Sequence, residues 1–228
     1  MATVSYRQVL HYSGAFAHSC QPKPLLTGKA YSFAKRLTDL FLVLVTAIAW
    51  LPAIGICALL IKLESWKDPV FFAQQRTGKG GRRFCMYKFR TMVSNAEELK
   101  SQLMHLNELK WPDFKITNDP RITRVGRFLR KTSLDEIPQL FNVIKGDMSL
   151  VGPRPTSFAP ATYSLWHTER LDVIPGLTGL WQILGRASTE FDERLRMDIA
   201  YIERRSWSFD MRLLLLTVPA MLKQKGAH

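Results

Sequence analysis

Blocks of apolar and polar residues alternate along the chain and predict mostly short helices around one long apolar segment. Every residue from 40 to 61 is uncharged, and most of them are aliphatic or aromatic. Leucines recur at helical spacing over 97–109, and arginines recur at steps of three opposite apolar residues over 121–131. Two further helices are predicted over 137–144 and 191–204.

Shorter patterns predict strands and loops. β-prone residues at 69–73 and 84–89 flank the glycine-rich turn 78–81, which predicts a β-hairpin. Glycine and proline are so frequent over 146–179 that loops are predicted there. The Trp, Leu and basic residues of 207–222 are typical of a segment lying in a bilayer interface. The predicted fold class is α+β and mainly helical, with a short hairpin and interfacial amphipathic helices.

The apolar segment is long enough to enter a membrane. As a straight helix, its 22 residues would extend about 33 Å, enough to cross a hydrocarbon core. Pro52 lies near its middle and removes the donor to the carbonyl of Ile48, which predicts a bend at that proline. Asp39 is costly at depth in the membrane, and we expect it to pair with Arg36 near the headgroups.

Charges on both flanks favour a re-entrant helix-break-helix hairpin over a straight crossing. The first 36 residues contain five basic residues and no acid, and Lys62 and Lys67 follow the apolar segment. Basic flanks favour the cytoplasmic side, so both ends are expected on that side. The alternative is an ordinary signal-anchor helix that tolerates its proline.

The net charge indicates an anionic partner. Lys and Arg number 32 against 19 Asp and Glu, which gives +13 and suits nucleic acid, acidic lipid or a phosphorylated substrate. The cysteines and histidines form no metal motif, residues 78–81 lack the P-loop spacing, and no Gly-x-Ser-x-Gly elbow occurs. No recognisable nucleic-acid motif accompanies the arginines, so nucleic acid is not the expected partner.

Two adjacent acids, Asp135 and Glu136, follow a basic helix and are the strongest candidates for chemistry. Adjacent helical side chains diverge by about 100°, so one carboxylate would attack a substrate or hold a metal while the other moves protons. The same residues also fit a helix start, with either Ser133 or Asp135 as the cap before Pro138. These patterns leave a helix cap and a catalytic pair equally open.

Several motifs in one order resemble those of the bacterial sugar transferases that are monotopic phosphoglycosyl transferases. They are Lys35-Arg36, the apolar segment with Pro52, Tyr87–Met92, Ser133–Asn142, Gly146–Ser149, Val151–Pro155 and Pro175–Gln182. The resemblance runs from about Tyr31 to the C-terminus. Leu51 departs from it, because many family members have a serine before the membrane proline.

The resemblance implies transfer of a sugar 1-phosphate from a UDP-sugar to polyprenyl (undecaprenyl) phosphate, with release of UMP, as the first membrane step of exopolysaccharide or other glycoconjugate synthesis. It makes Asp135 the covalent nucleophile and a Mg²⁺ ligand, and assigns Glu136 to proton handling or metal support. A carboxylate that attacks a diphosphate meets like-charge repulsion, which Mg²⁺ and arginines offset.

The same resemblance implies which residues bind the substrates. The expected phosphate ligands are Lys88, Arg90, Arg130, Arg154 and Arg186, and arginine suits bidentate contacts with phosphate. Asp198 and Tyr201 lie at helical spacing and are expected either near the nucleotide or in a structural role.

The expected organisation is a variable lead-in over 1–30, a re-entrant membrane hairpin over 31–66 and a cytoplasmic catalytic domain over 67–228. The hairpin would hold the protein monotopically in the bacterial cytoplasmic membrane, beside anionic lipids and with the active site facing the cytoplasm. The competing hypothesis is a membrane-tethered basic module that binds anionic lipid or nucleic acid without catalysis. That hypothesis explains the charge but not the acids that follow the arginines.

Overall fold

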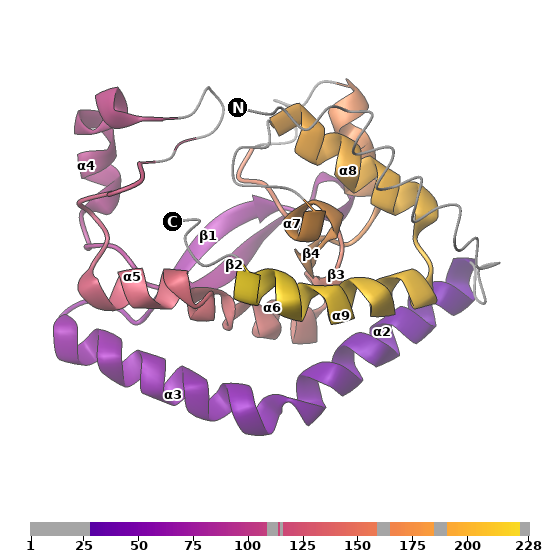
Figure 1. The fold of residues 1–228 in the computed structure, drawn as a ribbon, viewed down its shortest axis with the longest axis horizontal. Coiled ribbons are helices and arrows are strands. Elements are labelled where there is room, and N and C mark those ends of the chain that lie inside the picture. The colour runs from indigo at the N-terminus through magenta and orange to yellow at the C-terminus, as the bar shows by residue number, and fades with distance from the viewer. Residues whose placement is uncertain (1–27, 109–113, 115, 159–164, 185–190, 224–228) are drawn as a thin grey trace.

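The computed structural model describes residues 28–108, 114, 116–158, 165–184 and 191–223. It confirms a mainly helical α+β architecture in which two small sheets lie among the helices (Figure 1). Most of the lead-in expected over 1–30 lies outside the described residues, and so does Arg186.

Helices α2 (Gly28–Val45) and α3 (Ala47–Glu64) meet in a bend along one side of the protein (Figure 1). The break between them lies at Thr46, whereas Pro52, where the bend was expected, sits inside α3. A proline ring clashes with the carbonyl four residues earlier, so its disturbance falls on the N-terminal side. The prediction of a broken helix is confirmed, and its position is corrected toward the N-terminus.

Side chains supply hydrogen bonds at this break. Trp50 Nε1 donates to the carbonyl of Val43 at 2.9 Å, and Thr46 Oγ1 donates to the carbonyl of Leu42 at 2.6 Å. A carbonyl that leaves the helical ladder needs such a partner when it is buried. Leu51 has no side-chain donor, and the side-chain hydrogen bonds at this break come from Thr46 and Trp50.

The predicted ion pair between Asp39 and Arg36 is wrong. Asp39 is buried and accepts hydrogen bonds from Ser149 Oγ at 2.7 Å and from Leu150 N at 3.3 Å. Arg36 instead donates to two backbone carbonyls of α6 (Gln139–Lys145). Both side chains face the protein rather than headgroups, because α2 packs against the segments that follow it in sequence.

Among the described residues, α3 is the one helix long and apolar enough to cross a membrane. Only 17% of its apolar window is buried, and Ile48, Leu51 and Leu63 are exposed. A contiguous apolar surface of this kind is typical of contact with lipid or with another protein. The re-entrant path through a bilayer stays a prediction.

Strands β1 (Phe71–Thr77) and β2 (Arg83–Phe89) form the predicted antiparallel hairpin. The turn between them holds Gly80 at φ 63°, a left-handed conformation that glycine adopts without a steric penalty. Phe71 pairs with Phe89 at the opposite end, so Lys88 lies away from the glycine-rich turn.

The remaining predicted helices are present. The bounds changed for α4 (Ala96–Gln102), α5 (Arg124–Lys131) and α6, whereas α8 (Phe191–Arg204) has the predicted bounds. The helix predicted over 97–109 ends early and continues as a 3-10 turn over Met104–Leu106. The last segment forms α9 (Trp207–Lys223), and its place in a bilayer interface stays a prediction.

The described residues of the stretch rich in glycine and proline, together with the residues that follow it, hold only short elements, as predicted for the stretch. They are β3 (Ser149–Val151), a 3-10 turn over Leu165–Asp172, β4 (Gly176–Thr178) and α7 (Leu180–Leu184). Strands β3 and β4 pair in parallel. A Cβ on Gly176 would lie 2.0 Å from the nitrogen of Gly152, so this close backbone approach requires glycine.

One core joins the bent helices to the rest of the protein. Its buried members include Val43 and Trp50 from the helix pair, Met86 from β2, Val143 from α6 and Leu213 from α9. Burial of apolar surface from all these elements stabilises them as a unit. The helix pair is therefore part of the scaffold that holds the loops between these elements in place.

Candidate active site

Asp135 and Glu136 lie on a tight turn between α5 and α6. After α5, Ser133 adopts the left-handed conformation with φ 56°, and a 3-10 turn covers Leu134–Glu136. Ser133 is the one non-glycine residue with positive φ in the described ranges, and such strain gathers at functional sites. Ser133 makes no side-chain cap, and Pro138 occupies the N-cap position of α6. The capping interpretation of the pair is therefore wrong.

Glu136 is held between two cations from distant parts of the chain. Lys88 Nζ lies 2.9 Å from Glu136 Oε1. Arg154 donates hydrogen bonds to the same carboxylate from both Nη atoms, and Nη1 lies 3.0 Å from Oε2. Burial alone would raise the pKa of Glu136, but Arg154 and Lys88 hold it well below its usual range. Glu136 is thus ionised at neutral pH and orients both cations.

Asp135 has a different environment. Its carboxylate is partly exposed, and within the described ranges it makes no hydrogen bond or ion pair. Burial raises the pKa of Asp135 above the ordinary value; the charge of Glu136 adds to this, while Lys88 and the nearby arginines oppose it. A partly desolvated carboxylate without a partner, surrounded by cations, suits a nucleophile or a metal ligand.

Asn142 fixes Lys88 relative to this pair. Its Oδ1 accepts from Tyr87 N at 3.0 Å, its Nδ2 donates to Cys85 O at 2.7 Å, and its side chain is fully buried. These bonds satisfy the outer edge of β2 as a neighbouring strand would. Helix α6 and strand β2 are thereby locked together beside Glu136.

Arg170 supports the loop that carries Arg154. Its Nη2 donates to the carbonyl of Arg154 at 2.5 Å and to Asp198 Oδ2 at 2.6 Å. Burial raises the pKa of Asp198 to about 7, although Arg170 and Arg194 oppose the shift. A small pocket opens beside this loop and is lined by Thr77, Gly78, Pro153, Arg154, Pro155, Thr156, Arg170, Leu171, Val173 and Pro175. Asp198 therefore contacts the loop through Arg170, and its proximity to a nucleotide stays a prediction.

The other two described phosphate candidates occupy different positions. Arg130 Nε donates to Thr91 Oγ1 at 2.9 Å, and its charge acts on Asp135. Arg90 Nε donates to the carbonyl of Pro69 at 2.9 Å, away from the acid pair. The structure thus gathers three of the predicted cations around the acids, places Arg90 against the start of the β-hairpin, and leaves Arg186 outside the described residues.

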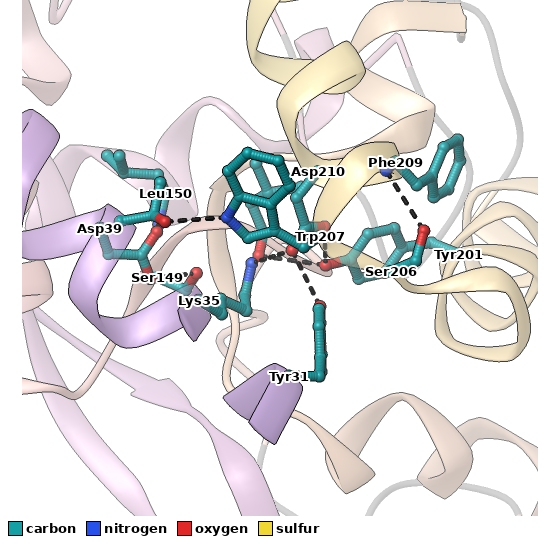
Figure 2. A network of polar contacts seen from close by, with 12 residues as sticks. Tyr31, Lys35, Asp39, Ser149, Leu150, Tyr201, Ser206, Trp207, Phe209 and Asp210 are labelled. Carbon is teal, nitrogen blue, oxygen red and sulfur yellow. Dashed lines mark hydrogen bonds and ion pairs between the residues drawn. The ribbon is translucent and has the colours of Figure 1, made fainter. Parts of the chain in front are cut away.

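Tyr201 belongs to a separate buried network (Figure 2). Asp210 accepts hydrogen bonds from Tyr31 Oη at 2.8 Å, Lys35 Nζ at 2.7 Å and Tyr201 Oη at 2.8 Å. The network joins α2, α8 and α9, and Tyr201 is only 2% exposed. Its structural role is evident here, and a contact with the nucleotide stays a prediction.

The acid pair fits a metal ion only together with a substrate. Among the described residues, no three His, Cys, Asp or Glu side chains gather as a metal site. Mg²⁺ is commonly held by one or two carboxylates plus substrate phosphates. Asp135 offers one unpartnered carboxylate, whereas the charge of Glu136 is neutralised by Lys88 and Arg154. The donor set therefore suits Mg²⁺ that is shared with a diphosphate.

Comparison with known proteins decides the family. The model of the bacterial sugar transferase family matches residues 30–224. The chain belongs to this family. The matched range includes the acid pair, the surrounding cations and the bent helices.

Several curated relatives are similar in sequence to most of this chain. Galactosyl transferase CpsE of Streptococcus agalactiae is 43% identical over 203 residues, which cover 87% of this chain and 45% of the relative. Undecaprenyl-phosphate galactose phosphotransferase of Salmonella typhimurium is 46% identical over 165 residues, 70% of this chain and 35% of the relative. Exopolysaccharide production protein ExoY of Rhizobium meliloti is 35% identical over 202 residues, 86% of this chain and 88% of the relative. The chain spans less than half the length of the first two relatives and most of the third.

Sequence reasoning missed three residues that build this sugar transferase site: Thr91, Asn142 and Arg170. Thr91 and Asn142 lie inside motifs that the sequence singled out, but their partners come from other elements. A polar residue among the apolar positions of a short helix signals a buried hydrogen bond, and Asn142 carries that signal. Arg170 lies in a turn-rich stretch without periodicity, and no pattern points to it.

Proposed function

We propose that this sugar transferase moves a sugar 1-phosphate from a UDP-sugar to undecaprenyl or another polyprenyl phosphate and releases UMP. The observation that carries the proposal is the unequal environment of two adjacent carboxylates. Glu136 forms ion pairs with Lys88 and Arg154, whereas Asp135 has no partner among the described residues. The name of the Salmonella relative, a galactose phosphotransferase acting on undecaprenyl phosphate, supports the same reaction class.

Asp135 acts as the nucleophile in the first of two displacements at one phosphorus and as the leaving group in the second. An oxygen of its carboxylate attacks the phosphorus next to the sugar, the bond to the bridging oxygen breaks, and UMP leaves with that oxygen. An oxygen of the polyprenyl phosphate then attacks the same phosphorus, and the bond to Asp135 breaks. The carboxylate is regenerated, and the product is a polyprenyl diphosphate sugar. The kinetics are ping-pong, because the nucleotide leaves before the lipid reacts.

Cations around the pair reduce the repulsion between Asp135 and the diphosphate. Lys88 and Arg154 are oriented by Glu136, and Arg130 adds a third positive charge that acts on Asp135. The low pKa of Glu136 favours this positioning role over proton transfer. Mg²⁺ held by Asp135 and the donor diphosphate would further neutralise the charge that develops on the leaving UMP.

The helix pair sets where the reaction takes place. The exposed apolar side chains of α2 and α3 would enter the cytoplasmic leaflet as a re-entrant hairpin, at the depth where a polyprenyl phosphate headgroup lies. The lipid tail then stays in the bilayer while its phosphate reaches Asp135 from the membrane side. This proposed arrangement would put the active site at the cytoplasmic face.

A UMP-release assay with a panel of UDP-sugars and polyprenyl phosphate tests the proposal. We expect release with at least one donor, loss of release with Asp135→Asn or a chelator, and normal release with Asp172→Asn, which changes an exposed acid. Incubation with the donor alone should add the mass of one sugar phosphate to the intact protein at Asp135. Normal turnover by Asp135→Asn would contradict the covalent mechanism. Retained lipid binding without any UMP release would instead favour a basic module that binds anionic membranes.

A further inference from the structure

The two arms of the bent helix pair contact opposite ends of the segment that carries Asp135 and Glu136. Glu64, the last residue of α3, accepts hydrogen bonds from the first two backbone amides of α5, at 2.8 and 3.1 Å. Arg36 of α2 donates to the carbonyls of Val143 and Ile144 near the end of α6, at 2.5 and 2.8 Å. Figure 1 shows the pair running along α5 and α6, with α3 beneath α5.

Each of these charges matches the helix end that it contacts. The first amides of a helix lack partners within the helix and carry partial positive charge, so they suit the carboxylate of Glu64. The last carbonyls carry partial negative charge and suit the guanidinium of Arg36. Thr123 completes the start of α5, because its Oγ1 accepts from Gly126 N at 2.9 Å. Both ends of the segment 124–145 are thereby anchored.

The segment 124–145 has a strained backbone conformation near its centre. Helices α5 and α6 are joined through Ser133, whose left-handed backbone is strained for a residue with a Cβ. Such a conformation persists only where the surrounding structure holds it. Helix α5 packs closely against the chain just after β2, because a Cβ on Gly126 would lie 2.1 Å from the carbonyl oxygen of Thr91. The strained turn that carries Asp135 therefore depends on the contacts that hold the segment on both sides of it.

We propose that Glu64 and Arg36 are positioning residues, which hold the Asp135–Glu136 turn in its reactive geometry by fixing both ends of the segment 124–145. The bent helix pair is then a part of the catalytic scaffold as well as a seat in the membrane. Its break at Thr46 sets the relation between the two anchors. The effect on catalysis rests on the proposed function, whereas the effect on the turn itself does not.

Variants of the full chain in detergent or vesicles test the two anchors. Glu64→Gln and Arg36→Gln remove one charge each, and the matched controls are Glu203→Gln and Arg127→Gln, which change exposed charges. Hydrogen exchange of a peptide covering 130–140 reports the turn directly. We expect both anchor variants to speed exchange at the amides of Glu136 and Ile137 by about tenfold, the size expected when a hydrogen bond worth roughly 1.4 kcal/mol is weakened.

Steady-state UMP release gives the second measurement. Each anchor variant should lower kcat by about tenfold and leave the KM for the UDP-sugar within twofold, because neither residue contacts the reacting turn directly. The double variant should lose less than the product of the single losses, since a segment released at one end is already free at the turn. Should Arg36→Gln not fold, Arg36→Lys keeps the charge with a single donor group and takes its place.

Each outcome decides the proposal. Exchange and kcat equal to those of the controls would overturn it, and so would a lower melting temperature with unchanged exchange and unchanged kcat of the folded protein. Losses that multiply in the double variant would overturn the coupling between the anchors. If the unaltered protein releases no UMP with any donor, the proposed function fails, and the exchange experiment still decides whether the anchors hold the turn.

Discussion

Two clusters in this protein both combine carboxylates with basic side chains, but they differ in whether every carboxylate has a partner. The cluster around Glu136 is partly exposed and leaves Asp135 unpartnered among the described residues. In the Asp210 network, both carboxylate oxygens accept hydrogen bonds, and Asp210 is 1% exposed (Figure 2). A closed and satisfied cluster holds helices together, whereas an open cluster keeps one acid poised for chemistry. The presence of charged side chains does not distinguish a reactive site from a structural cluster. An acid without a partner inside the cluster is the feature that distinguishes them.

The variant Asp135→Asn tests this comparison most strongly. We expect UMP release to fall by at least about 10³-fold, because the proposed nucleophile is lost. The melting temperature should not fall, because the raised pKa of Asp135 means that the fold disfavours its ionised form at neutral pH. UMP release and thermal unfolding of the purified variant check both expectations. A large loss of stability would place Asp135 among the structural groups instead.

Asp210→Ala should show the reverse behaviour. It leaves Lys35 as a nearly buried charge without its carboxylate, which lowers the free energy of unfolding by about 3–5 kcal/mol. The melting temperature then falls on the order of 10 °C, and kcat per folded molecule stays close to normal at a permissive temperature. Adding Lys35→Met should recover part of the stability. A double variant no more stable than Asp210→Ala alone would contradict the ion-pair explanation.

Glu136→Gln lies between these extremes. We expect kcat to fall by about 10²-fold, because Lys88 and Arg154 lose the carboxylate that orients them. The lowered pKa of Glu136 means that its contribution to stability is complete above the ordinary value of 4.5 and is lost as pH falls through the lower folded value. Acid titrations of stability should therefore decline less steeply for the variant below pH 4.5. Equal acid sensitivity would argue against the ion pairs.

Asp198→Asn gives the smallest and most specific effect. The folded pKa of about 7 exceeds the ordinary 3.8, so the contribution of Asp198 to stability is complete below 3.8 and is lost as pH rises toward 7. The stability of the unaltered protein relative to the variant should decline as pH rises through this window and level off above it. Denaturant unfolding at several pH values measures the difference. A flat difference would show that Asp198 is already ionised, as its contact with Arg170 alone would favour.

Local patterns were sufficient where neighbours in sequence decide the structure. The spacing of arginines predicted α5, the glycine-rich turn predicted the β-hairpin, and the apolar segment predicted a broken helix. The motifs identified the family and the acid pair. The break itself was misplaced, because Thr46 and Trp50 bond to carbonyls of the preceding turn in ways that the proline signal does not contain.

Only the tertiary structure decided how the acids differ. The chain order fixes that Asp135 and Glu136 are adjacent, but the partners of Glu136 come from β2 and from the loop after β3. The same holds for Asp39, which joins Ser149 rather than nearby Arg36. Periodicity and turn chemistry act over a few residues, so the sequence determined the elements and singled out the adjacent acids. The pairing of buried charges depends on which distant segments pack together, and that is settled only when the core has formed.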